Sequence, residues 1–275
     1  MWEKRSGWML GAVFLTAGFV YVQMTLFLLQ FVLHVRIPVN LFNFCFEILR
    51  FIGFPVRMNV MLFLLGSSLV CSMVALLREG LAAYRFRRAE RLLADKEVTQ
   101  AACEEHGLDR KRFTVIEHRD SIAMTIGLAR PRIVLSTGLI GELSDRELHA
   151  VIAHEKYHLR RRHPLAIFLL SLVGIAFWYI PIYRWFIGKY KMLIELRADR
   201  HAIDATGGVT DLGSALLVML KRGQPSPTAL SSVSFAENAI NLRLKLLLDP
   251  HFKPSFRPPL IPCLVSVFAF FFIVF

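Results

Sequence analysis

The stretch VIAHEKYHLRRRHPL, residues 151–165, carries two histidines four residues apart with a glutamate beside the first. Residues four apart on a helix lie on one face, so His154 and His158 project together at a spacing that suits zinc chelation. Glu155 lies where it can reach a water on the metal and act as a general base. The stretch therefore indicates hydrolytic zinc chemistry, although a solvated helix face also carries such residues.

A third ligand is offered by IELRADRHAIDATGG, residues 194–208. Glu195 and Asp199 lie four apart on a helix that we expect to end at the glycine pair 207–208. Glu195 completes a His-His-Glu set with one position open for water, the arrangement of catalytic zinc. Asp199, one turn on, can accept a hydrogen bond from the outer nitrogen of a ligand histidine. Together the two motifs predict a gluzincin-type site.

Two kinds of element must position these residues. Ser144 and Glu147 have the spacing of a capping box, which predicts a helix over residues 145–162 that carries both histidines. Before it come three short β-rich segments, RFTVIEH, SIAMTIG and PRIVLSTG, separated by turn residues. We expect SIAMTIG or RIVLSTG to supply an edge strand to which an extended substrate adds by main-chain hydrogen bonds.

The composition excludes an ordinary soluble domain. Hydrophobic residues make up 55% of the chain and the mean hydropathy is +0.49, yet 33 Lys and Arg face 21 Asp and Glu. The basic segment RFRRAER adjoins an apolar run and lacks interleaved aromatics beyond Phe86, so it indicates an anchor at an anionic membrane surface and no nucleic-acid site. The four cysteines are scattered without CxxC spacing, which argues against a disulfide-stapled fold or a cysteine metal site.

Apolar runs divide the chain into regions. Residues 7–33 and 58–77 are long enough to span a bilayer, and an amphipathic helix is expected at the interface between them. We expect an N-terminal membrane region over 1–77, a zinc metallopeptidase domain over 78–256 and a C-terminal transmembrane helix over 257–275. The predicted fold class is a mainly α-helical multi-pass membrane protein with a small α+β, zincin-like, cytoplasmic metallopeptidase domain.

Basic residues near the ends of the spans predict the orientation. They cluster at residues 78–91 and 156–162, so the region 78–163 and the N-terminus are expected in the cytoplasm. Residues 165–180 are nearly long enough to cross, which would separate Glu195 from His154. Pro181 can break that helix and let the chain return. We therefore expect a membrane-associated hairpin over 164–194. The sequence is compatible with a re-entrant hairpin and with a shallow one.

The runs TIGLARPRIVLSTGLIGELSDRELHAVIAHEKYHLRRRHPL, WYIPIYRW and ELRADRHA resemble the bacterial integral-membrane zinc peptidases of the BlaR–MecR antirepressor type. The likeness is detailed over residues 113–205. It implies that His154, His158 and Glu195 bind Zn²⁺, that Glu155 is the catalytic base and that Asp199 supports a ligand. The HtpX and CAAX-endopeptidase group shares these motifs but usually has longer membrane segments between them, so it ranks second.

Receptor members of the resembled family continue past the last span into an extracellular penicillin-binding sensor. This chain ends at Phe275, so we expect that sensor to be absent.

The resemblance implies an endopeptidase in the cell membrane that cleaves a protein on the cytoplasmic side, either a cytosolic regulator or the chain itself. A quality-control or processing protease of the HtpX type is the alternative. A non-catalytic membrane signalling protein with a structural zinc ranks lower, because such a site needs no Glu155. A homo-oligomer and a separate sensor or repressor partner both stay open. His163 and His201 flank the site and are interpreted as surface or helix-dipole residues.

Overall fold

A computed structural model describes residues 2–34, 44, 47, 51, 58–221, 243–246, 249 and 258–274 of the chain. The chain divides into two compact units. The first comprises residues 1–79, 169–187 and 257–275, and the second comprises residues 80–168 and 188–256. The amphipathic helix predicted between the first two spans lies outside the described residues, apart from single positions.

Long apolar helices build the first unit. Helix α1 covers Trp2–Leu33, α3 covers Met58–Leu93 and continues into the second unit, and α11 covers Leu260–Val274. Two segments of α1 and α3, Val13–Leu33 and Leu62–Leu93, are long and apolar enough to cross a membrane. The first two predicted spans therefore fall on suitable helices. Helix α11 belongs with the shorter apolar helices, so a third crossing stays a prediction.

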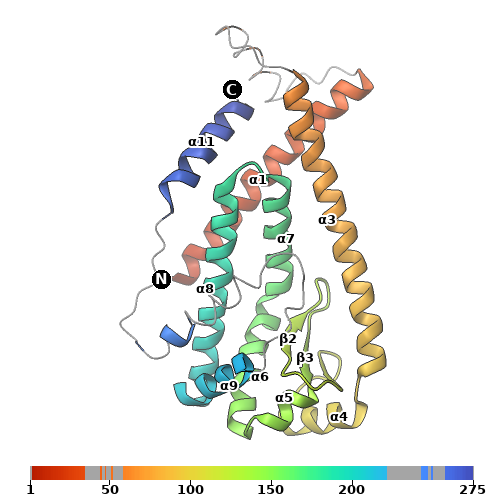
Figure 1. Ribbon diagram of the computed structural model, residues 1–275, viewed down its shortest axis with the longest axis vertical. Coiled ribbons are helices and arrows are strands. Elements are labelled where there is room, and N and C mark those ends of the chain that lie inside the picture. The colour runs from red at the N-terminus through yellow and green to blue at the C-terminus, as the bar shows by residue number, and fades with distance from the viewer. Residues whose placement is uncertain are drawn as a thin grey trace. The chain divides into compact units, whose positions relative to one another are not determined.

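Helices α7 (His163–Ala176) and α8 (Pro181–Thr206) form a helical hairpin (Figure 1). Pro181 is the first residue of α8. Proline has no amide hydrogen, and an amide at this position would have no hydrogen-bond acceptor within the helix. Gly174 of α7 lies so near α8 that a Cβ there would be 2.5 Å from Ile187 Cδ1. The chain leaves the second unit at Phe168 and re-enters it at Gly188. The two halves of the predicted zinc site therefore belong to one unit, whereas the membrane association of the hairpin stays a prediction.

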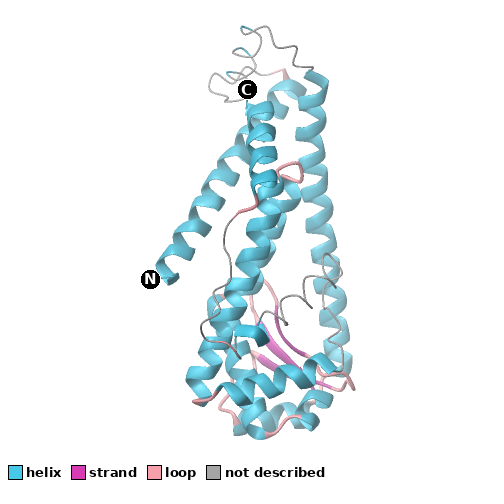
Figure 2. Cartoon of the chain, turned by 60° about the vertical axis from the view of Figure 1, so that its left-hand side comes forward, coloured by secondary structure: helices cyan, strands magenta, loops and turns pink. Residues whose placement is uncertain are grey.

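A three-stranded sheet lies in the second unit, drawn in magenta in Figure 2. Strand β3 (Arg132–Ser136) is central, with β1 (Phe113–Ile116) parallel to it and β2 (Ala123–Ile126) antiparallel. All three predicted strand segments are confirmed. Of the two alternatives for an edge strand, SIAMTIG contains the edge strand β2, whereas RIVLSTG contains the central strand and is excluded.

Alternate residues of β3 pack into different cores. Ile133 and Leu135 join a cluster with residues of α4 (Lys96–Glu105), α5 (Thr137–Glu142) and α6 (Asp145–Arg161). Val134 joins a second cluster, against which Phe86 of α3 packs. Because side chains alternate along a strand, the sheet is covered on both faces, and α6 is fixed against one of them.

Helix α6 has clear signals at both ends. The side chain of Ser144 accepts from the amide of Glu147, whose carboxylate accepts from the amide of Ser144 at 2.8 Å, so the predicted capping box is present. Arg162 ends the helix in the left-handed conformation, with φ of 51°. Small residues of α6, Ala150 and Ala153, pack against α8 and against α9 (Val209–Lys221). These contacts bring α6 and α8 close enough to share a site.

Candidate metal centre

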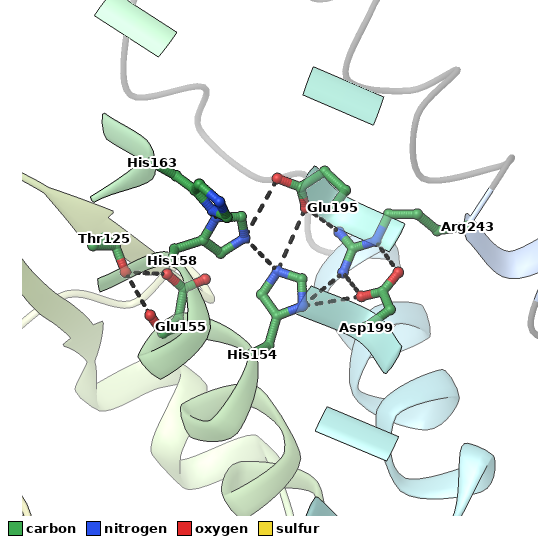
Figure 3. A network of polar contacts seen from close by, with 8 residues as sticks. All are labelled: Thr125, His154, Glu155, His158, His163, Glu195, Asp199 and Arg243. Atoms are coloured by element: carbon green, nitrogen blue, oxygen red, sulfur yellow. Dashed lines mark hydrogen bonds and ion pairs between the residues drawn. The ribbon is translucent and has the colours of Figure 1, made fainter. Parts of the chain in front are cut away.

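The two histidines of the HExxH motif lie on one face of α6. His154 and His158 are both buried, and their Nε2 atoms lie 3.1 Å apart. The helical spacing of four residues produces this approach, because side chains at i and i+4 stack one turn apart. Two imidazole nitrogens thus converge on one point (Figure 3).

Helix α8 supplies a carboxylate to the same point. Glu195 Oε2 lies 3.4 Å from His154 Nε2, and Glu195 Oε1 lies 3.5 Å from His158 Nε2. Ligand atoms about 2.0 to 2.1 Å from a tetrahedral zinc ion lie roughly 3.3 Å from one another. One ligand atom from each of the three residues falls within 4.8 Å of the others. Both the donor types and their spacing therefore fit a zinc ion.

The outer nitrogens of both histidines also have partners. Asp199 Oδ1 lies 3.0 Å from His154 Nδ1, the contact that the sequence predicts. His163 Nδ1 lies 2.8 Å from His158 Nδ1. The interpretation of His163 as a surface residue was wrong: its side chain is buried, because the turn at Arg162 directs it onto His158. The outer nitrogen of each histidine thus contacts a second side chain, as is usual for histidine ligands at metal sites.

Glu155 lies next to the candidate ligands in a buried position. The hydroxyl of Thr125, on the edge strand β2, lies 2.7 Å from Glu155 Oε2 and 3.1 Å from the Glu155 backbone oxygen. Burial raises the pKa of the Glu155 carboxyl, while nearby His154 and the Thr125 hydroxyl act in the opposite direction. Burial thus favours the protonated form of this carboxyl relative to an exposed glutamate.

Arg243 joins the site from a segment that no sequence pattern marks. Its Nε and Nη2 donate to the two carboxylate oxygens of Asp199 at 2.8 Å and 2.6 Å, and its Nη1 lies 3.2 Å from Glu195 Oε2. Arg243 stands 44 residues after Asp199, in a helical stretch of residues 243–246. Sequence reasoning missed this residue.

Charge on the cluster is distributed unevenly between the histidines. Burial and Arg243 disfavour a charge on His154, but the carboxylates of Asp199 and Glu195 outweigh them and raise its pKa to about 9. Burial lowers the pKa of His158 to about 4. Burial opposes the charge on Glu195, yet the hydrogen bond from His154 and nearby charges hold its pKa well below the usual range. A divalent cation between these atoms would displace the His154 proton, because metal ligands must be deprotonated.

All five residues that the sequence proposes for the site come together in the second unit: His154, Glu155, His158, Glu195 and Asp199. Their chemical roles stay predictions. His201 is not among them. Its ring lies 5.3 Å from that of Tyr157, and its Nδ1 is buried without a hydrogen-bond partner among the described residues.

Comparison with known proteins points to one family. A family model described as BlaR1 peptidase M56 matches residues 55–247, which is more than half of the chain. The regulatory protein BlaR1 of Bacillus licheniformis is 24% identical over 135 residues, or 48% of this chain and 22% of that protein. The chain thus spans about a fifth of the length of this curated relative.

Proposed function

The chain belongs to the BlaR1 peptidase M56 family, and we propose that it is a membrane-associated zinc endopeptidase. His154, His158 and Glu195 bind the metal, and Glu155 is the general base. The single observation that carries the proposal is the spacing of the three candidate ligand groups, 3.1 to 3.5 Å apart. The buried carboxylate of Glu155 beside them supplies the group that a purely structural zinc site would not need.

Zinc, when bound, supplies a Lewis acid and lowers the pKa of water. Glu155 accepts a proton from the attacking water at a carboxylate oxygen and then delivers it to the leaving amine. Burial raises the pKa of this carboxyl, which favours its uptake of the proton. The Thr125 hydroxyl keeps the Glu155 carboxylate in place through its hydrogen bond.

Side chains behind the ligands select the histidine tautomers. With the proton on Nδ1, His154 donates to Asp199 and leaves its Nε2 lone pair for the metal. His158 donates in the same way to His163 Nδ1, which acts as a neutral acceptor because burial lowers the pKa of His163 to about 3. Both Nε2 atoms are then free to bind a cation.

An extended peptide is the substrate that the surroundings favour. Thr125 belongs to edge strand β2 and contacts Glu155, so the edge of the sheet runs beside the proposed base. A peptide segment that adds to β2 by main-chain hydrogen bonds would pass this base. We propose a cytosolic regulator, or the chain itself, as the substrate, with the site on the cytoplasmic side of the cell membrane and with several membrane crossings.

Metal content tests the proposal. The purified parent should hold about one zinc per chain, as a single His-His-Glu site requires, and His158→Ala should lose most of it. His149→Ala is the matched control, because His149 lies on the same helix with an exposed side chain. Elemental analysis measures all three proteins. Equal zinc content in the parent and in His158→Ala would show that the metal is not bound by the histidines of α6.

A further inference from the structure

The guanidinium of Arg243 is shared by two carboxylates of the site. Three of its contacts are ionic: Nε and Nη2 bridge both oxygens of Asp199, and Nη1 reaches Glu195 Oε2 at 3.2 Å. The Arg243 side chain is 11% exposed and that of Asp199 is 5% exposed, so the pair is largely shielded from water. The Glu195 side chain is 29% exposed. A carboxylate shielded from water is costly unless it is paired, and Arg243 pairs with both Asp199 and Glu195.

Arg243 also acts on the histidine next to these carboxylates. Asp199 Oδ1 is approached by Arg243 Nη2 at 2.6 Å and by His154 Nδ1 at 3.0 Å, so one oxygen accepts from both groups. The other oxygen of Asp199 accepts from Arg243 Nε. With both of its oxygens held, the carboxylate cannot rotate away from His154, and the imidazole is fixed in the tautomer that leaves Nε2 for a metal.

From these contacts we propose that Arg243 is a positioning residue of the metal centre. It fixes Asp199 behind His154, and it fixes Glu195 with its oxygens toward both histidine Nε2 atoms. This inference rests on the proposed zinc site and goes beyond it, because it adds a residue that neither helix of the site supplies. The centre is then complete only when residues 243–246 are in place.

The segment that carries Arg243 is anchored where this role requires it. Leu244, its neighbour, packs against the cluster in which α6, α8 and α9 meet. The backbone at Arg243 is thereby held beside the two helices that carry the candidate ligands. A planar fork can serve two carboxylates at once, whereas the single ammonium of a lysine cannot reproduce these contacts.

The test compares Arg243→Lys and Arg243→Met in the full-length chain with the parent. Zinc affinity is measured by competition with a chelator, and the visible spectrum of the Co²⁺-loaded protein reports the geometry of the ligands. Loss of a residue that orients ligands typically weakens metal binding about 10- to 100-fold. We expect Arg243→Met to show such a loss, Arg243→Lys to show part of it, and both Co²⁺ spectra to change.

Arg200 provides the matched control. It pairs with Asp204 at 3.1 Å on α8, but the two side chains are 77% and 62% exposed. Arg200→Lys and Arg200→Met should therefore leave zinc affinity and the Co²⁺ spectrum unchanged. The melting temperature of each metal-free variant is recorded alongside, because a purely structural role would lower this temperature without changing the affinity of the folded protein. If Arg243→Met does not fold, the zinc affinity and Co²⁺ spectrum of Arg243→Lys test the proposal.

A double-mutant cycle with Asp199→Asn separates the two contacts. If Arg243 acts on His154 through Asp199, part of the loss caused by Arg243→Lys should disappear in the Asp199→Asn background. The remainder would measure the contact with Glu195. If the double variant loses zinc affinity by the product of the two single losses, Arg243 does not act on His154 through Asp199.

Unchanged zinc affinity in both Arg243 variants would overturn the positioning role and leave the proposed function intact. A parent protein that binds no zinc would instead reject the proposed function and this inference together.

Discussion

Glu155 is the proposed general base, and its surroundings bear most directly on that role. Its carboxylate is buried, which disfavours the charged form, and it accepts a hydrogen bond from the hydroxyl of Thr125, which lies on β2 and not on the helix that carries Glu155. A hydrogen bond to the charged form lowers a carboxyl pKa, whereas burial raises it. The strand and the helix therefore set the basicity of Glu155 together.

Replacement of Thr125 by valine should shift the pH dependence of proteolysis. Valine keeps the shape and the strand preference of threonine but removes the hydroxyl, so the Glu155 carboxylate loses a stabilising donor and its pKa rises. A base works only above its pKa, so the acidic limb of kcat/KM against pH should move to higher pH, with the activity at high pH largely kept.

Thr114→Val is the control for this experiment, because Thr114 makes the same kind of contact in β1 with Glu90, away from the candidate ligands. It should leave the pH profile unchanged. An acidic limb at the same pH in the parent and in Thr125→Val would show that the hydroxyl does not tune the base.

Local spacing predicts most of the site, and non-local contacts account for what it misses. His154 and His158 follow from the pitch of one helix, and Glu195 with Asp199 follow from a second. His163 was misjudged because its basic neighbours suggested exposure, while the left-handed Arg162 turns it inward. Arg243 had no signal, since one arginine 44 residues beyond its partner matches no periodic pattern.

At the scale of elements, α6 is the support for the candidate ligands and base. Its start is fixed by the capping box at Ser144, and its end is fixed by the left-handed Arg162. A non-glycine residue in this conformation costs roughly 1 to 2 kcal/mol. The sharp change of direction that it produces places His163 behind His158, so the strained turn contributes to the order of the site.

Two glycine substitutions at the end of α6 should change stability in opposite directions. Arg162→Gly relieves the left-handed strain and should stabilise the fold by about 1 kcal/mol. Arg160→Gly places glycine inside the helix at an exposed position and should destabilise it by about 1 kcal/mol. Thermal unfolding in detergent measures both. A lower melting temperature for Arg162→Gly would mean that its side chain stabilises the turn by more than the strain costs.

Caps and strand segments were predictable at this scale, but strand order was not. Ser144, Glu147 and the glycine after α8 are local signals that fix helix ends. The alternation of apolar residues predicts that a segment is a strand, but it does not predict which other strand pairs with it. Pairing of β1 with β3 joins residues about twenty positions apart in the chain, so the central place of RIVLS emerges only in the folded protein.

At the scale of the whole molecule, the apolar helices and the residues of the candidate metal centre belong mainly to different units. Both candidate spans begin in the first unit, and all the described residues of the metal centre belong to the second. Membership of the BlaR1 peptidase M56 family agrees with an association with membranes. The number of crossings and the cytoplasmic orientation stay predictions from the apolar runs and the basic residues that flank them.

The most direct test of the account is Glu155→Gln. The amide keeps the size of the side chain and leaves His154, His158 and Glu195 for zinc, so metal content should equal that of the parent. It cannot take a proton, so cleavage should fall roughly 10²- to 10⁴-fold. Self-cleavage of the purified chain and cleavage of casein are followed by mass spectrometry, with zinc measured on the same samples. Glu195→Gln should lose metal as well as activity. Cleavage by zinc-loaded Glu155→Gln at the parent rate would contradict the assignment of this chain as a zinc endopeptidase.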